Sequence, residues 1–445
     1  MCQCTANADC NDGLNCTADS CDNGQCVHSA AEEGKICSDA TGCNSGGTCK
    51  VGKCTGGKQQ LWSVLEGDYG TEVGYDVEVL DTDLACLVTK QPLGGAGKAH
   101  LGRRSPTGEV VWSLDLDPAS TEGRPALAPL AGGLAANMGQ SLARVSADGK
   151  LVWAVTPTGG FPRLVGLGVT PAGGVAVAAN QTAAKNWDVS LLTFGSDGQK
   201  ALDVPVALPN TSDLAHAMAV TTTGNFVVAG VSSNKDGSGQ FVVRFDATGK
   251  LLSSGPIEGS TAKLWTAAVG VAGGDVVLGG DDRVARINPD GKLVWERVVS
   301  LFDIYALAPI GDGGWMAVGN AMDNLAVARL APNGVRLWDK DWGGAMLEHG
   351  WGLAILPNGA IGLAGSNRTQ GKGYADAWMF RTDAFANQSC GDSGSCAAKA
   401  ATGCDDTEFC TVNSCAAATG CVTSKLYGKP VCGDGKMCGD DAVCK

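Results

Sequence analysis

The chain has 445 residues, of which 65 are glycine, 44% hydrophobic and 18% charged, and its net charge is −13. This composition is typical of a folded, turn-rich all-β protein of two or three domains, and it excludes a disordered chain. The acidic excess argues against nucleic acid or an anionic membrane surface as a partner. No apolar run approaches the roughly 20 residues that a membrane span requires, so we expect none.

The 20 cysteines gather at the two ends of the chain. Ten precede Lys58, nine follow Asn387, and Cys86 alone lies between them. Such clusters are typical of disulfide-bonded modules in an oxidising compartment, so we expect a secreted, extracellular or cell-surface protein. The sequence therefore predicts a Cys-rich module over 1–57, a central domain over 58–386 and a second Cys-rich module over 387–445.

The first module has too few hydrophobic side chains for a core, so we expect disulfides to stabilise it by about 2–4 kcal/mol each. Zinc is the alternative, but the module lacks Cys-x2-Cys pairs and has His28 as its only histidine. The cysteines predicted to form disulfides here are Cys2, Cys4, Cys10, Cys16, Cys21, Cys26, Cys37, Cys43, Cys49 and Cys54.

Residues 15–21 of this module read Asn-Cys-Thr-Ala-Asp-Ser-Cys. This segment resembles the Cys-Thr-x-Asp-x-Cys repeat of slime-mould extracellular matrix proteins, and similar repeats occur in secreted bacterial proteins. The resemblance covers only the two Cys-rich modules. It implies a matrix or surface setting and no particular activity.

A tight turn followed by a strand recurs through the central domain. Residues 290–296 read Asp-Gly-Lys-Leu-Val-Trp-Glu, and variants of this segment carry the turn glycines Gly108, Gly149, Gly198, Gly249, Gly291 and Gly334. Their spacing of roughly 40–50 residues is the period of a propeller blade. Short apolar runs bounded by glycine, such as 276–280 and 315–319, predict strands that are buried on both faces.

Three inner strands recur seven times, starting near residues 75, 124, 165, 216, 265, 305 and 351, but an outer strand follows only six of these sets. The missing outer strand lies at the front of the domain, around Trp62. We therefore predict an all-β, seven-bladed propeller in which this N-terminal strand pairs with the strand 377–381. Such pairing closes the ring non-covalently and leaves no open end.

The segments 341–344, Asp-Trp-Gly-Gly, and 376–381, Asp-Ala-Trp-Met-Phe-Arg, add to the evidence for blades. Together they resemble a broad family of secreted bacterial propellers, and the resemblance covers all of 58–386. It implies the fold and says almost nothing about function, because propellers carry many unrelated activities.

Several side chains recur at equivalent blade positions. We expect Trp112, Trp153, Trp295 and Trp338 to pack between neighbouring blades. We expect a set of arginines to bond carbonyl groups or to stack on neighbouring rings: Arg103, Arg144, Arg244, Arg286, Arg329 and Arg381. Cys86, within an apolar run, is predicted to be a buried free thiol.

One position near the start of each innermost strand favours a binding role. Counting eight residues back from each inter-strand turn gives Tyr75, Arg124, Val165, His216, Trp265, Tyr305 and Trp351. Four of the seven are aromatic in a chain with 6% aromatic residues, so the ring would suit a sugar or a peptide at the channel mouth. The alternative is that these large side chains only plug the channel. All but Val165 are candidate ligand-binding residues.

The second module repeats the first. Its predicted disulfide cysteines are Cys390, Cys396, Cys404, Cys410, Cys415, Cys421, Cys432, Cys438 and Cys444. This number is odd, so we expect the module to be truncated and the chain to continue beyond Lys445 with a partner cysteine. An intermolecular bridge or a free thiol at a natural terminus is the alternative.

No motif points to catalysis. The four histidines, His28, His100, His216 and His349, fall in no recognisable nucleophile or metalloprotease motif, and the acidic pairs lack an EF-hand pattern. We therefore expect no enzyme activity, catalytic residue, metal or cofactor. The sequence favours a structural or interaction protein, a segment of a larger repetitive surface, matrix, filament or adhesion protein. Its partners would be other proteins, or copies of itself, bound through the Cys-rich modules. The alternative is a lectin-like propeller that binds glycans or peptides.

Overall fold

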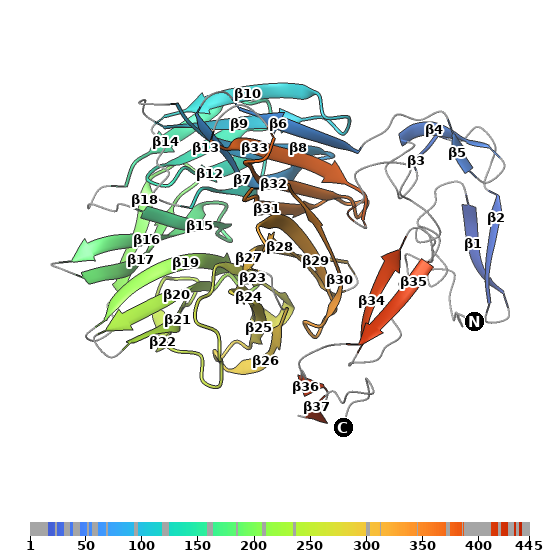
Figure 1. The fold of residues 1–445 in the computed structure, drawn as a ribbon. Helices are drawn as coiled ribbons and strands as arrows, with labels where there is room; N and C mark the ends of the chain where they lie inside the picture. The colour runs from blue at the N-terminus through green and yellow to red at the C-terminus, as the bar shows by residue number, and fades with distance from the viewer. Residues whose placement is uncertain are drawn as a thin grey trace.

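The computed structural model shows seven four-stranded antiparallel sheets arranged around one axis (Figure 1). It describes residues 61–386 apart from 68–69, 93–96, 118–123, 158–162, 184–185, 207–210, 235–236, 300–302, 312, 345, 371–373 and 385, and in the flanks only strands. The predicted seven-bladed propeller is confirmed. Among the described residues the one helical element is the 3-10 turn η2 (Ala272–Gly274), and none could span a membrane.

Six blades consist of four consecutive strands each. Blade 1 has β7 (Thr71–Leu80), β8 (Asp83–Gln91), β9 (Lys98–Arg104) and β10 (Val110–Leu116). Blade 2 has β11 (Ala126–Leu130), β12 (Gly133–Asn137), β13 (Leu142–Ser146) and β14 (Leu151–Val155). Blade 3 has β15 (Arg163–Val169), β16 (Val175–Ala183), β17 (Asn186–Phe194) and β18 (Lys200–Val206).

The next three blades follow the same order. Blade 4 has β19 (Ser212–Val220), β20 (Phe226–Asn234), β21 (Gly237–Phe245) and β22 (Leu251–Gly255). Blade 5 has β23 (Ala267–Gly270), β24 (Val276–Gly280), β25 (Arg283–Ile287) and β26 (Leu293–Val298). Blade 6 has β27 (Asp303–Pro309), β28 (Trp315–Ala321), β29 (Asn324–Leu330) and β30 (Arg336–Trp342).

Blade 7 joins the two ends of the domain. Its inner strands are β31 (His349–Ile355), β32 (Ile361–Asn367) and β33 (Asp376–Thr382), and its outer strand is β6 (Trp62–Glu66). The pairing is antiparallel, with Trp62 opposite Arg381 and Glu66 opposite Ala377, so β6 and β33 lie side by side (Figure 1). The predicted closure by the N-terminal strand is therefore confirmed.

The described strands of the flanks form hairpins. In the first flank they are β1 (Thr17–Asp22), β2 (Gln25–Ala30), β3 (Ile36–Ser38), β4 (Ser45–Lys50) and β5 (Lys53–Thr55), and in the second β34 (Thr411–Ala416), β35 (Gly420–Lys425), β36 (Val431–Cys432) and β37 (Lys436–Met437). Cys21 lies opposite Cys26 in one hairpin and Cys415 opposite Cys421 in another, so the sequence repeat is a repeated hairpin. Cys21 and Cys49 each take part in a disulfide. The remaining cysteines of both modules lie outside the described side chains, and their pairing stays a prediction.

The core lies between the blades. The described residues form seven apolar clusters, and each cluster joins two neighbouring sheets, which leaves no blade interface without one. The cluster between blades 7 and 1 contains Cys86, which is a free, buried thiol as predicted. Burial raises the pKa of this thiol to about 12, so it stays protonated and packs as a small apolar group.

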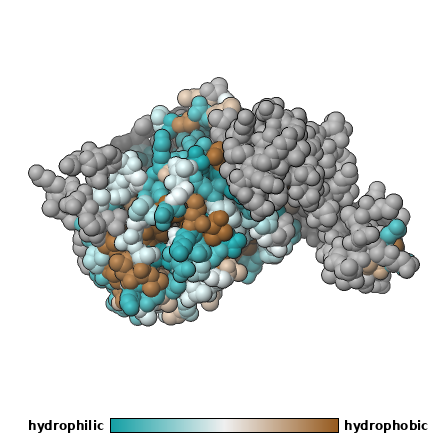
Figure 2. Space-filling view, turned by 90° about the horizontal axis from the view of Figure 1, so that it is seen from below, coloured by the Kyte–Doolittle hydropathy of each residue, from teal (hydrophilic) through white to brown (hydrophobic). Residues whose placement is uncertain are grey.

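The outermost strands differ from the inner ones because one of their faces meets solvent. β32 and β33 are buried at every position, whereas β10 and β18 alternate between exposed and half-buried residues. Exposed large apolar residues occur on β10, β14, β22 and β26. Figure 2 shows such apolar patches among polar residues on one face of the propeller.

The recurrent tryptophans pack between neighbouring blades, as predicted. A Cβ added to Gly149 in blade 2 would stand 2.7 Å from Cδ2 of Trp112 in blade 1, and one added to Gly198 in blade 3 would stand 2.9 Å from Cδ2 of Trp153 in blade 2. These glycines also have φ near +80°, where a side chain is strained. The turn position therefore requires glycine for two reasons: its backbone has positive φ, and the neighbouring indole leaves no room for a Cβ.

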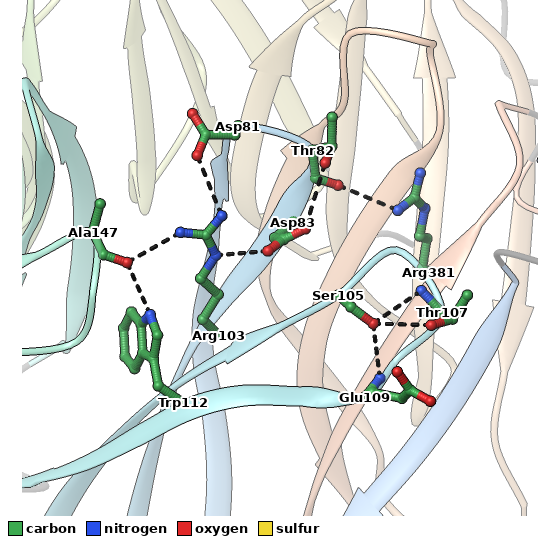
Figure 3. Close-up of polar contacts among 10 residues, drawn as sticks. All are labelled: Asp81, Thr82, Asp83, Arg103, Ser105, Thr107, Glu109, Trp112, Ala147 and Arg381. Atoms are coloured by element: carbon green, nitrogen blue, oxygen red, sulfur yellow. Dashed lines mark hydrogen bonds and ion pairs between the residues drawn. The ribbon is translucent and has the colours of Figure 1, made fainter. Parts of the chain in front are cut away.

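The recurrent arginines bond the same turns. Arg103 Nη1 and Trp112 Nε1 both donate to the carbonyl oxygen of Ala147 in the next blade, at 3.1 and 3.0 Å (Figure 3). Arg103 also pairs with Asp83 at 2.6 Å and with Asp81 at 3.2 Å. Arg381 donates to the carbonyl of Thr82 at 3.4 Å, across the closure of the ring (Figure 3). The predicted structural role of these arginines is confirmed at both positions.

Gly149→Ala should destabilise the propeller more than Gly132→Ala. Both glycines have positive φ, at 83° and 76°, but a Cβ at Gly132 has nothing within 4 Å. We expect Gly132→Ala to lower the free energy of unfolding by about 1 kcal/mol through backbone strain. Gly149→Ala should lower the free energy of unfolding by about 2 kcal/mol more than this, because its methyl group displaces Trp112. Denaturant unfolding measures both, and equal losses would contradict packing by the indole.

Candidate functional site

The candidate site is a cavity of about 180 Å³ inside the ring. Four inner strands carry a β-bulge at the same level, and the unpaired residues of these bulges are Tyr75, His216, Tyr305 and Trp351. A bulge turns its extra residue out of the alternating pattern of the strand. All four of these side chains line the cavity, so the sequence was right to place them together.

Trp265 does not belong to this ring, and its predicted place was wrong. It is fully buried in the core between blades 4 and 5, and Thr266 lines the cavity instead. The turn of blade 5 places Gly274, not Gly273, where blade 4 has Gly224, as the turn hydrogen bonds show. Counting back from the wrong glycine moved the predicted residue by one position.

Val165 was counted in the ring but does not line the cavity either. It is 4% exposed, and it pairs with Ala178 because the bulge of β15 comes after it. Gly166, with φ of +65°, and Leu167 take the channel-facing place in blade 3.

Arg124 crosses the ring from blade 2. Its guanidinium donates to the backbone carbonyls of Thr266 in blade 5 and Tyr305 in blade 6, and it lies 5.7 Å from the ring of Tyr305 and 5.9 Å from that of Trp351. Burial lowers its pKa to about 10, so it is charged at neutral pH. Arg124 therefore connects three blades from inside the ring.

The aromatic side chains of the ring contact one another. The centroid of Trp351 lies 4.5 Å from that of Tyr305, 5.8 Å from that of Tyr75 and 5.1 Å from that of His349, which stacks on it. Rings that contact one another and Arg124 have fewer free faces for a ligand. Glu348 beside His349 serves the local loop instead, because its carboxylate accepts from the backbone N–H groups of Gly344 and Thr369.

Two carboxyl groups of the site were missed by the sequence reasoning. Asp76 and Glu78 lie two residues apart on β7, and both line the cavity. Asp76 accepts hydrogen bonds from the backbone N–H groups of Leu127 at 2.7 Å and of Val77 at 2.9 Å. Side chains two residues apart on a strand point to the same face, so this alternation along β7 after the bulge could have identified Asp76 and Glu78.

The groups of the cavity have shifted pKa values because they are enclosed. Burial raises the pKa of Asp76 to about 7, against the opposing effects of its backbone hydrogen bonds and Arg124. Burial, and then the charge of Asp76, raise the pKa of Glu78 to about 8. Burial, with help from Arg124 and Arg163, lowers the pKa of His216 to about 4, so this imidazole is neutral. Near neutral pH the site thus holds one cation and two partly protonated carboxyls.

This arrangement favours internal bonding over ligand chemistry. Arg124 donates to carbonyls of the protein, and Asp76 accepts from its backbone. Within the described part of the chain no group of three or more His, Cys, Asp or Glu side chains is placed to hold a metal ion. The cavity is also smaller than the roughly 300–1,000 Å³ of usual ligand pockets.

The free energy of unfolding should fall less steeply above pH 6.5 in the Glu78→Gln variant than in the unchanged chain. In the unfolded chain both carboxyls ionise near pH 4, whereas in the folded protein they keep their protons to about pH 7 and 8. The folded state then binds more protons, so the free energy of unfolding falls as pH rises through this window. His216 has the opposite effect, but only between about pH 4 and 6.5.

Denaturant unfolding at pH 6.5 and 8 measures the difference. Glutamine does not ionise, so Glu78→Gln should show a smaller decline than the unchanged chain. His216→Gln is the control, because loss of this imidazole should not reduce the decline. An identical decline in the Glu78→Gln variant would show that Glu78 does not hold its proton in the cavity.

Comparison with known proteins identifies the fold. No family model and no curated protein matches the sequence. The WD40 domain of Pan2 from Neurospora crassa aligns with a TM-score of 0.50 at 12% identity, covering 72% of this chain and 94% of that chain. A protein of unknown function from Bacteroides caccae aligns with a TM-score of 0.38 at 14% identity, covering 61% of this chain and 94% of that chain. The polysaccharide lyase Uly1 aligns with a TM-score of 0.48 at 11% identity, covering 72% of this chain and 91% of that chain. The likeness to the Pan2 domain concerns the propeller fold alone.

Proposed function

We propose that the chain is a non-enzymatic, extracellular structural and interaction protein, a segment of a larger repetitive surface, matrix or filament protein. The observation that supports this most is the place where the flanks join the propeller. Trp62 at the start of β6 lies opposite Arg381 near the end of β33, so both flanks leave from the same end of the strands of blade 7. Neighbouring Cys-rich modules can then contact each other directly, and the propeller projects beside them.

The flanks support the extracellular part of the proposal. They contain nineteen of the 20 cysteines, and Cys21 and Cys49 each take part in a disulfide. Stable disulfides are a property of oxidising compartments. The same hairpin occurs at both ends of the chain, so a module of one copy can meet a homologous module of another.

The centre of the ring supports a structural use of the propeller. The place where a propeller would hold a small ligand is reduced to about 180 Å³ by Arg124 and the contacting rings of Tyr75, Tyr305 and Trp351. A filled centre makes the disc rigid and leaves its outer surfaces for contacts. This favours the plug over the ligand site for these side chains.

Self-association of the oxidised chain tests the proposal. Sedimentation of the full chain between micromolar and tenfold higher concentrations should show oligomers that grow with concentration. Reduction of the disulfides should abolish them, because the modules that make the contacts lose their crosslinks. The unfolding transition of the propeller should survive reduction, because its one cysteine is a free thiol. A monomer at every concentration under oxidising conditions would contradict module-to-module contact.

The lectin-like alternative has one observation in its favour. Tyr75, Tyr305 and Trp351 line a cavity with both polar and apolar walls, and aromatic faces of this kind bind sugar rings.

A glycan-binding screen with the full chain decides this alternative. If the cavity binds sugars, Trp351→Ala should abolish the signal, whereas Trp187→Ala, which removes an indole paired with Arg163 away from the cavity, should not. Absence of any signal from the unchanged chain would remove the lectin-like function.

A further inference from the structure

Blade 4 lacks the tryptophan that five of the seven blades carry on their outer strand. Arg144 pairs with Trp153 in blade 2 and Arg286 with Trp295 in blade 5, whereas Arg244 pairs with Ser253 in blade 4. Ser253 therefore stands where an indole would fill the space between blades 4 and 5. Its side chain reaches only to 3.8 Å from the position of a Cβ on Gly291.

A cleft of about 370 Å³ occupies this place. Its walls include Val242, Ile257, Leu293, Arg244 and Ser253, and Gly291 lies on its far side. Val242 and Ile257 are buried core residues, so the cleft reaches down to the apolar cluster between the two blades. It is about twice the size of the central cavity.

The other blades show which side chain packs against the equivalent turn glycine. A Cβ added to Gly334 would stand 2.4 Å from Trp295, and one added to Gly108 would stand 2.9 Å from Trp62, but the nearest atom to a Cβ on Gly291 is Cδ of Arg244 at 3.5 Å. Blade 3 also lacks the tryptophan, and there Leu202 fills the space, 2.8 Å from a Cβ on Gly249. Blade 4 has no outer-strand side chain that fills the slot, and the buried side chain of Arg244 forms one of its walls.

We propose that this cleft binds an aromatic side chain, of the size of tryptophan, presented by a partner polypeptide. The glycine turn is the group that packs against an indole elsewhere in this ring, and Arg244 opposite Ser253 adds a guanidinium, which favours the face of an aromatic ring. Around the cleft, Leu251, Leu252 and Val294 are exposed by 44%, 47% and 52%. This apolar rim fits neighbouring side chains of a polypeptide better than a free small molecule.

Ring stacking carries the recognition, and the indole N–H is dispensable. The indoles of Trp112 and Trp153 donate to turn carbonyls, whereas Nε1 of Trp62 has no partner although its ring packs against a turn glycine in the same way. The proposal concerns a surface that the scaffold proposal does not use, so either can fail alone.

The test uses three probes with the full chain: free indole, an acetylated and amidated peptide Leu-Trp-Leu, and the same peptide with alanine for tryptophan. Calorimetric titration should show that Leu-Trp-Leu binds at least tenfold more tightly than indole, and that the alanine peptide does not bind. Equal binding of indole and peptide would contradict a polypeptide partner, and binding of neither would overturn the site.

Filling the slot should abolish binding. Ser253→Trp restores the residue of the other blades, and Ser253→Leu imitates Leu202 of blade 3, so each should remove peptide binding. Ser253→Trp should also raise the melting temperature by about 2–4 °C. Ser233→Trp is the matched control, because Ser233 is an exposed residue of the same blade that does not line the cleft, so binding should stay intact. Unchanged binding in both Ser253 variants would overturn the proposal.

Discussion

The architecture depends on the antiparallel pairing of β6 with β33. Five residue pairs, from Trp62 opposite Arg381 to Glu66 opposite Ala377, turn an open row of sheets into a ring. Without β6, blade 7 would present an unpaired edge, and the cluster between blades 7 and 1 would lose Trp62. Because every core cluster joins two blades, each sheet is stabilised by both of its neighbours only when the ring is closed.

Much of this fold could be read from the sequence because its repeats obey strong local rules. Turn glycines with positive φ, apolar inner strands and a tryptophan on most outer strands recur at a fixed period, and one surplus strand at the front implied the closure. The chain order of the strands therefore gave the blade number. Cys86 followed from its apolar neighbours in the same way.

The channel was harder to predict because its residues are placed by irregularities. A bulge shifts the alternation of a strand by one residue, and one extra glycine in the turn of blade 5 was enough to exchange Thr266 for Trp265. Asp76 and Glu78 were missed because one position per blade was considered, and only the ring brings Arg124 near Asp76. The empty slot of blade 4 has a sequence signal, Ser253 in place of tryptophan, but its size depends on how the neighbouring walls pack.

The position of the two exits has a mechanical consequence. Tension between the flanks would act on the first residue pair of β6 and β33, Trp62 with Arg381, and would peel the strands apart one pair at a time. Pulling from opposite ends would instead shear all the pairs at once. A pulled chain of such units would therefore lengthen by opening discs at modest force, unless contacts between adjoining Cys-rich modules take the strain first.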